Sequence, residues 1–147
     1  GSFIHGLGWD KELIARIEAA ARVRATTTST TVIAALQAVG ATHVTLCTPY
    51  TDDINAIEAQ YFAANGFPVV NSSGLGLLMD RDIARLSPED AQAQVARTDV
   101  SEADCIFIIC RNDSASLPAG NPAASACAAP QVLIMSSRLS ICEVWLA

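Results

Sequence analysis

Short apolar segments alternate with longer, helix-like stretches from residue 41 onward, and this alternation constrains the fold more than any other feature. Strands that are separated by enough chain for a helix pair in parallel, through right-handed crossovers. The sequence therefore predicts an α/β fold with an open, parallel, four-stranded sheet and flanking helices. The four strands are expected at residues 43–47, 67–70, 105–109 and 132–135.

Helices are expected to flank this sheet, because capping residues precede several stretches with helical periodicity. The helix that begins at Thr51 runs through Ile54, Ile57, Tyr61 and Phe62 to Asn65-Gly66. The Thr/Ser run at 26–31 most simply begins a helix, although its free backbone amides could also hold an anion. Helix starts are predicted at Asp10, in the run 26–31, at Thr51 and at residues 87–90, and a last helix is predicted near residues 139–146.

Residues 114–147 are atypical in composition. Only Arg138 and Glu143 are charged in this stretch, whereas Ala, Ser and Pro dominate it. A solvated helix face between two strands normally carries more charge than this. The secondary structure expected between the third and fourth strands therefore rests on a weaker pattern than the rest.

The charge balance limits the classes of partner. Nine Lys and Arg against fifteen Asp and Glu give a net charge of -6, which argues against nucleic acid and anionic membrane surfaces. The densest apolar run, residues 105–110, is far shorter than the roughly 18 residues of a membrane span. Five scattered cysteines favour reduced thiols and a cytoplasmic location. Without a Cys-x-x-Cys pair or a His cluster, no metal site is predicted.

In an open parallel sheet, ligands bind beyond the carboxyl ends of the strands. This rule selects the segment after residue 47, residues 71–82, the segment that begins at Cys110, and Ser136-Ser137. Gly74-Leu75-Gly76 also follows a strand, but Met79 stands where a dinucleotide-binding loop has its third glycine, so no nucleotide cofactor is expected.

Cys110 and Tyr50 are the two residues in these segments with the clearest chemical potential. Cys110 ends an apolar strand where a helix is expected to begin, and a helix N-terminus favours the thiolate. The alternative is a buried structural cysteine. Tyr50 precedes a capped helix and could donate a hydrogen bond to a carboxylate or an oxyanion. The alternative is a loop aromatic that packs on the sheet edge.

Several segments, taken together in order and spacing, resemble the aspartate/glutamate/hydantoin racemase superfamily. Within it, the sequence is most similar to maleate cis-trans isomerases and arylmalonate decarboxylases. The resemblance covers residues 1 to about 113, and its most specific part is Thr48-Pro49-Tyr50-Thr51-Asp52-Asp53. It also includes residues 1–3, 26–30, 83–85 and the strand that ends in Cys110.

The resemblance implies a cofactor-free enzyme that acts on a small carboxylic or dicarboxylic acid. Such enzymes have two similar α/β halves with the active site between them, and a cysteine or its substitute ends a strand in each half. A thiolate adds to, or takes a proton from, the carbon next to a carboxylate. By resemblance, Cys110 is the catalytic cysteine of the second half and Tyr50 binds the substrate carboxylate. The resemblance also implies that Thr51, Asp80, Ile83 and Asn112 line the substrate pocket.

The resemblance also divides the chain. Residues 1–40 would be the trailing helical part of the first half, and residues 41–147 the second half. Gly1-Ser2-Phe3 resembles the residues that directly follow the first-half cysteine. We therefore expect an incomplete site with little activity alone, and apolar surface that favours a homo-oligomer. The alternative function is a non-catalytic α/β fragment that serves as a binding or assembly module.

Overall fold

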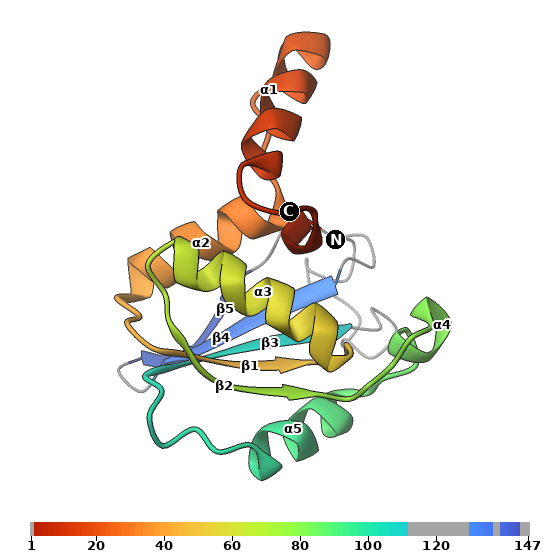
Figure 1. The fold of residues 1–147 in the computed structure, drawn as a ribbon, viewed down its shortest axis with the longest axis vertical. Coiled ribbons are helices and arrows are strands. Elements are labelled where there is room, and N and C mark those ends of the chain that lie inside the picture. The colour runs from red at the N-terminus through yellow and green to blue at the C-terminus, as the bar shows by residue number, and fades with distance from the viewer. Residues whose placement is uncertain (1, 112–129, 137–138, 145–147) are drawn as a thin grey trace, which may run out of the picture.

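A five-stranded sheet in the order β2-β1-β3-β4-β5 forms the centre of the fold (Figure 1). The computed structural model describes residues 2–111, 130–136 and 139–144, and from Cys110 onward it describes the backbone. Strands β1 (Val44–Thr48), β2 (Val69–Gly74) and β3 (Cys105–Arg111) are parallel. The predicted α/β class, with parallel strands and flanking helices, is confirmed. Two further strands, β4 (Pro130–Ser136) and β5 (Leu139–Val144), extend the sheet.

The carboxyl-terminal part of the sheet corrects the predicted parallel four-stranded arrangement. The strand expected at 132–135 is present as β4, but it is antiparallel to β3, and β5 is antiparallel to β4. The helix expected near residues 139–146 is wrong, because β5 occupies residues 139–144. Only residues 137–138 separate β4 from β5. So short a connection joins antiparallel neighbours, since a parallel crossover needs a dozen or more residues.

Strand β2 is displaced along the chain from its predicted position at residues 67–70. It extends through the polar residues Asn71, Ser72 and Ser73 to Gly74. Backbone pairing with β1 explains this, because Thr45 to Thr48 lie opposite Asn71 to Gly74. As an edge strand whose side chains are partly exposed, β2 does not need the apolar pattern by which buried strands are recognised.

Helices lie on both faces of the sheet. Helices α2 (Thr28–Val39) and α3 (Asp52–Ala64) cover one face, and α5 (Pro88–Arg97) lies on the other (Figure 1). The predicted starts of these three helices are confirmed. Thr27 caps α2 by accepting a hydrogen bond from the backbone of Thr30, and Ser87 and Asp90 form a reciprocal capping box at α5.

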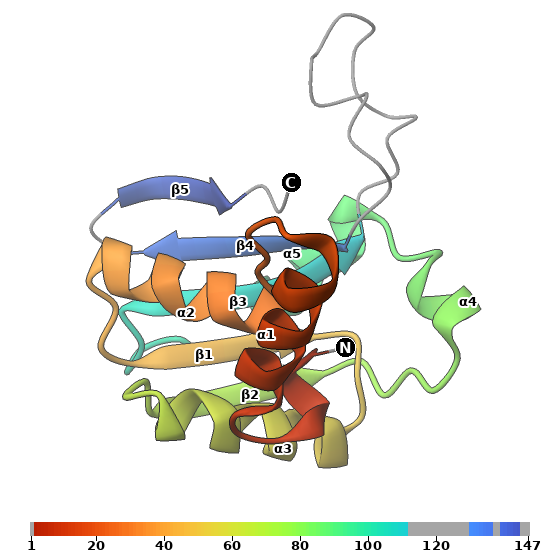
Figure 2. The same ribbon diagram turned by 90° about the horizontal axis from the view of Figure 1, so that it is seen from above.

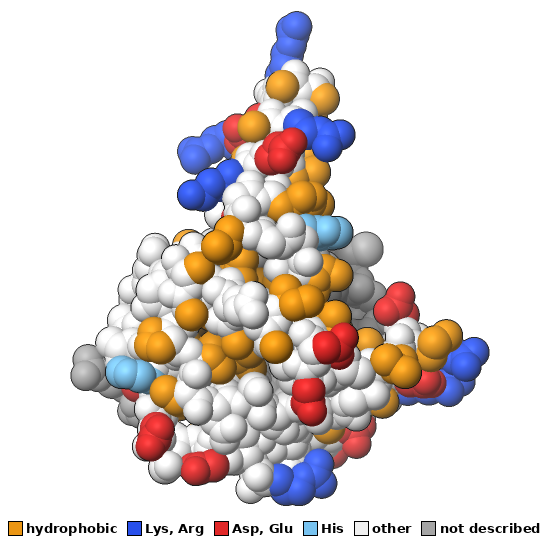
Figure 3. Space-filling view, viewed as in Figure 1, with side chains coloured by type: hydrophobic (Ala, Val, Ile, Leu, Met, Phe, Trp, Pro, Cys, Tyr) orange, Lys and Arg blue, Asp and Glu red, His pale blue; other side chains and the backbone are white. Residues whose placement is uncertain are grey.

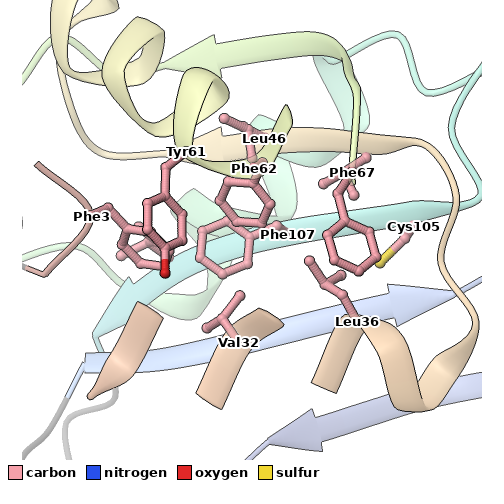
Figure 4. Packing of buried hydrophobic residues seen from close by; sticks show 11 residues of the cluster. Phe3, Val32, Leu36, Leu46, Tyr61, Phe62, Phe67, Cys105 and Phe107 are labelled. Carbon is pink, nitrogen blue, oxygen red and sulfur yellow. The ribbon is translucent and has the colours of Figure 1, made fainter. Parts of the chain in front are cut away.

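The core lies between the sheet and the helices α2 and α3 (Figure 4). Phe3, in a 3-10 turn (η1, Ser2–His5), stacks on Phe62 with 5.6 Å between ring centroids. Phe62 in turn lies 5.0 Å from Phe107 of β3. Val32 and Leu36 of α2 are fully buried beside these rings. The first residues of the chain therefore share one core with the sheet.

Helix α1 (Trp9–Ala21) projects away from this body (Figure 1). Hydrophobic side chains gather along it and on the face of the body beneath it (Figure 3), and Ile17 and Val23 are among the exposed ones. Among the described residues, none of the helices has the length and apolar character needed to span a bilayer.

The prediction that Asp10 caps α1 is wrong. Gly8 precedes the helix, and Asp10 is buried in its first turn. The Asp10 carboxylate accepts hydrogen bonds from the hydroxyls of Thr30 (2.7 Å) and Tyr61 (3.1 Å). These bonds to α2 and α3 replace the local capping contact, and the one carboxylate thereby ties three helices together.

Candidate functional site

The carboxyl ends of β1, β2 and β3 lie at one edge of the sheet (Figure 2). Thr48 lies opposite Gly74, and Cys47 lies opposite Ile108. The backbone of Cys110 is therefore two residues beyond that pair, close to the level at which β1 ends. Antiparallel pairing puts Ser136 opposite Cys105, at the other edge, so the prediction that Ser136 belongs to this edge is wrong.

Backbone hydrogen bonds join the loop after β1 to the loop after β2. Leu75 donates to the carbonyl of Thr48 (3.1 Å), Gly76 to that of Tyr50 (3.0 Å), and Leu77 to that of Pro49 (3.0 Å). A side chain at position 74 would collide with the backbone carbonyl of Tyr50 and would lie 2.7 Å from Nδ2 of Asn55. Gly74 thus permits the close approach of two loops.

Gln94, on the inner face of α5, stabilises the same edge from the face of the sheet opposite α2 and α3. Its side chain is buried, and Nε2 donates to the backbone carbonyls of Thr48 and Ser73, both at 2.8 Å. This one side-chain amide therefore bridges the carboxyl ends of β1 and β2. Sequence reasoning missed this residue, although a polar side chain on the covered face of a short helix is a signal that could have drawn attention to it.

Tyr50 is half-buried and packs against the core cluster. Burial raises the pKa of Tyr50, and the negative charges of Glu58 and Asp80 raise that pKa further. Within the described residues, no side chain forms a hydrogen bond with its hydroxyl. The phenol therefore stays protonated in the neutral range and is available as a hydrogen-bond donor.

The other residues predicted to line the pocket are placed unequally. Thr51 is the N-cap residue of α3, and its carbonyl accepts a hydrogen bond from Asn55 (3.0 Å). Asp80 begins the short helix α4 (Asp80–Ile83), is exposed, and is close enough to Tyr50 for its charge to act there. Ile83 ends α4 and is half-buried. Asn112 lies outside the described residues.

Two buried polar residues of α3 were not predicted as part of this edge. Asn55 and Glu58 face inward, whereas their apolar neighbour Ile57 is exposed. The hydroxyl of Thr48 donates to Oδ1 of Asn55 at 2.5 Å. In residues 2–111, Nδ2 of Asn55 and Oε2 of Glu58 have no hydrogen-bond partner. Burial raises the pKa of Glu58 to about 7. The apolar stripe Ile54-Ile57 hid both residues from sequence reasoning.

The alternative that the Thr/Ser run holds an anion receives no support from its contacts. Ser29 donates its backbone amide to the hydroxyl of Ser2 (3.0 Å), and Thr30 donates to Oγ1 of Thr27 (3.3 Å). Both amides are thus engaged by the chain itself. Across the described ranges, no three His, Cys, Asp or Glu residues come together as a metal site would require.

The fold and this strand edge define a racemase-like α/β protein, and the comparisons with known proteins place it further. The family model for arylmalonate decarboxylase matches residues 1–133, so the chain belongs to the arylmalonate decarboxylase family. The resemblance expected from the sequence is therefore confirmed. None of the curated proteins compared with the chain matches it.

Solved structures agree with this assignment. An unliganded arylmalonate decarboxylase is 27% identical with a TM-score of 0.65, and the match covers 73% of this chain and 47% of that one. A maleate isomerase variant from Pseudomonas putida S16 with maleate is 22% identical (TM-score 0.62; 69% and 43% covered). A mutant maleate cis-trans isomerase from Nocardia farcinica with a covalently bound succinylcysteine intermediate is 20% identical (TM-score 0.62; 69% and 44% covered). The two isomerases support the fold alone, and the chain matches less than half the length of each protein.

Proposed function

We propose that this chain is the carboxyl-terminal portion of a cofactor-independent, racemase-like isomerase or decarboxylase for a small carboxylic or dicarboxylic acid. The observation that carries the proposal is the family match, because it includes both Tyr50 and Cys110. The parallel register supports it, since it brings the loop of Tyr50 and the end of β3 to one edge of the sheet.

The chemistry requires a base and a set of donors. A proton next to a carboxylate is weakly acidic, because negative charge develops on the carboxylate when that proton leaves. In the proposed reaction, the Cys110 thiolate takes this proton, or its sulfur forms a bond to the carbon of a double bond whose electron pair moves toward the carboxylate. Tyr50 donates a hydrogen bond to the carboxylate. Thr51, Asp80, Ile83 and Asn112 are proposed to line the substrate.

The proposal includes a second half of the site. The arylmalonate decarboxylase structure is about twice as long as its match to this chain. We propose that residues 1–40 trail a first racemase-like half and that residues 41–147 form the second. The first half would supply the acid or base on the opposite face of the substrate. The Nocardia farcinica structure shows that this fold can host a cysteine adduct of a dicarboxylate.

The test is an assay of the purified chain with maleate, aspartate and aryl malonates, with Cys110→Ser as the matched variant. We expect little or no turnover alone, but a rise in melting temperature with a diacid that Tyr50→Phe reduces. If the chain shows robust turnover and Cys110→Ser abolishes it, the proposal that the site is incomplete is overturned. Absence of any thermal shift with every acid would instead favour a non-catalytic binding or assembly module.

A further inference from the structure

Glu58 is the most unusual titratable group at the strand edge, and the proposed chemistry does not use it. Its side chain is 1% exposed on the inner face of α3, and Oε2 has no hydrogen-bond partner among residues 2–111. Asn55, three residues earlier on the same face, has an equally unpartnered Nδ2. Two polar groups are therefore buried next to the loop of Tyr50 without being satisfied by the surrounding core.

Burial without a counter-charge favours the neutral form of a carboxylic acid. In the described part of the chain, the ion pairs join Arg81 and Arg85 to Asp82, and none involves Glu58. The group therefore keeps its proton to a much higher pH than an exposed glutamate, consistent with a pKa raised to about 7. It can gain or lose a proton in the neutral range.

Two acidic groups, Glu58 and Asp80, act on Tyr50. Tyr50 is close enough that the Glu58 charge raises its pKa, after the larger effect of burial. The charge of Asp80 on α4 acts on Tyr50 in the same direction. A ligand carboxylate bound at Tyr50 would therefore be repelled by the ionised forms of two acidic groups, of which only Glu58 is buried.

We propose that Glu58 is a proton-holding group behind Tyr50, and that a carboxylate bound at Tyr50 is accompanied by proton uptake at Glu58. This inference rests on the proposed function, because it takes Tyr50 as the carboxylate anchor. Two negative charges repel strongly where water is excluded, so binding shifts Glu58 to its neutral form. By linkage, affinity falls as pH rises through the titration of Glu58. Glu58 is thus a positioning residue: in its protonated form it places no negative charge beside the carboxylate that Tyr50 binds.

Calorimetric titration of the chain with maleate or phenylmalonate near pH 7 tests this coupling directly. The observed enthalpy is measured in buffers of different ionisation enthalpy, and its slope gives the number of protons taken up. We expect uptake of a fraction of a proton in the parent chain, because Glu58 is partly ionised at a pH near its pKa. Glu58→Gln should bind with no uptake and with an affinity that does not change between about pH 6 and 8.

The control is Glu12→Gln, which removes an exposed glutamate of α1 and should leave the uptake unchanged. Binding without proton uptake in the parent chain overturns the inference and leaves the proposed function intact. If neither acid binds, the proposal that Tyr50 binds a carboxylate is overturned. Carbon-13 NMR of the Glu58 carboxyl group then tests by itself whether Glu58 holds a proton in the neutral range. A midpoint near 7 that is absent from Glu58→Gln supports the proton-holding role, whereas an ordinary glutamate midpoint overturns it.

Discussion

Gly74 lies directly against the backbone carbonyl of Tyr50, and no larger residue fits between the two loops they belong to. This contact fixes how closely the end of β2 approaches the candidate carboxylate anchor. Three backbone hydrogen bonds between residues 48–50 and 75–77 hold the loops in that arrangement. The position of Tyr50 therefore depends on a residue that has no chemistry of its own.

Gly74→Ala should destabilise the fold and weaken diacid binding together. The added methyl group would overlap the Tyr50 carbonyl and press on Asn55, and such overpacking costs about 1–3 kcal/mol. Urea denaturation measures the loss. Gly76→Ala is the control, because position 76 has open space and its cost comes only from a left-handed backbone, about 1 kcal/mol. Equal losses in the two variants would argue against the contact.

Glu58→Gln should change how stability depends on pH. Its carboxyl pKa is 4.5 in the unfolded chain and about 7 in the folded one, so between these values the folded state holds a proton that the unfolded state has lost. Stability therefore falls as pH rises from 4.5 to about 7, by at most roughly 3 kcal/mol, and levels off above that. The variant should lack this fall in denaturation curves taken across the window. The same fall in Glu58→Gln would assign it to another group.

Asp10→Asn should loosen the junction of α1, α2 and α3. The hydroxyls of Thr30 and Tyr61 both donate to Oδ2, and the amide oxygen of asparagine can take its place only as an uncharged acceptor, so the loss of two charge-assisted hydrogen bonds costs about 1–3 kcal/mol. Burial opposes ionisation of Asp10, but the hydrogen bonds from Thr30 and Tyr61 prevail and hold its pKa below the ordinary value. Its stabilising effect is thus present above pH 3.8 and is lost as pH falls through the lowered pKa. An acid titration of unfolding, compared with that of Glu12→Gln, checks both statements.

Gln94→Glu should be tolerated at low pH and harmful at neutral pH. A neutral carboxylic acid can still donate one hydrogen bond to the carbonyls of Thr48 or Ser73, whereas a carboxylate can donate none and is repelled by both. Amide exchange at Leu75, whose N–H bonds to Thr48, should accelerate above the pKa of the new acid. Gln92→Glu, exposed on the same helix, is the matched control. Exchange at Leu75 that ignores pH would contradict the bridging role.

Thiol alkylation should separate Cys110 from the cysteines of the core. Burial raises the pKa of Cys47, and burial together with Asp104 raises the pKa of Cys105 to about 12, so neither should react while the chain is folded. If Cys110 is the proposed thiolate, its reaction with iodoacetamide should begin well below the reference pKa of about 8.5. Peptide mass spectrometry measured against pH distinguishes the sites. A midpoint for Cys110 at or above the reference value would favour the structural alternative.

Local signals were sufficient for much of the fold. Thr27, Ser87 and Asp90 make their capping bonds within their own helix turns, so the starts of α2 and α5 could be read from neighbouring residues. The run at residues 105–109 is apolar enough to indicate a strand covered on both faces. Position at the strand ends made Tyr50 and Cys110 candidates, and the family resemblance gave each a role, because no local pattern separates site residues from packing residues.

What sequence reasoning missed depends on contacts between distant segments. Asp10 looks like a cap until Tyr61, fifty-one positions later, donates to it. Glu58 faces inward because of the rotation of α3 about its own axis against the sheet. The sequence does not indicate this rotation, since the apolar neighbour Ile57 is the more exposed of the two. The direction of β4 follows from its partner β3, and a strand's own residues do not encode its direction.

The burial of Phe3 has a practical consequence for any experiment on this chain. The backbone of Ser29 donates a hydrogen bond to Ser2, and Phe3 packs among the rings of Tyr61 and Phe62. The amino end therefore emerges beside the carboxyl edge of the sheet (Figure 2). An affinity tag or fluorescent protein fused there would lie over the candidate site and compete with ligands, so a reporter attached to the projecting α1 is the better choice.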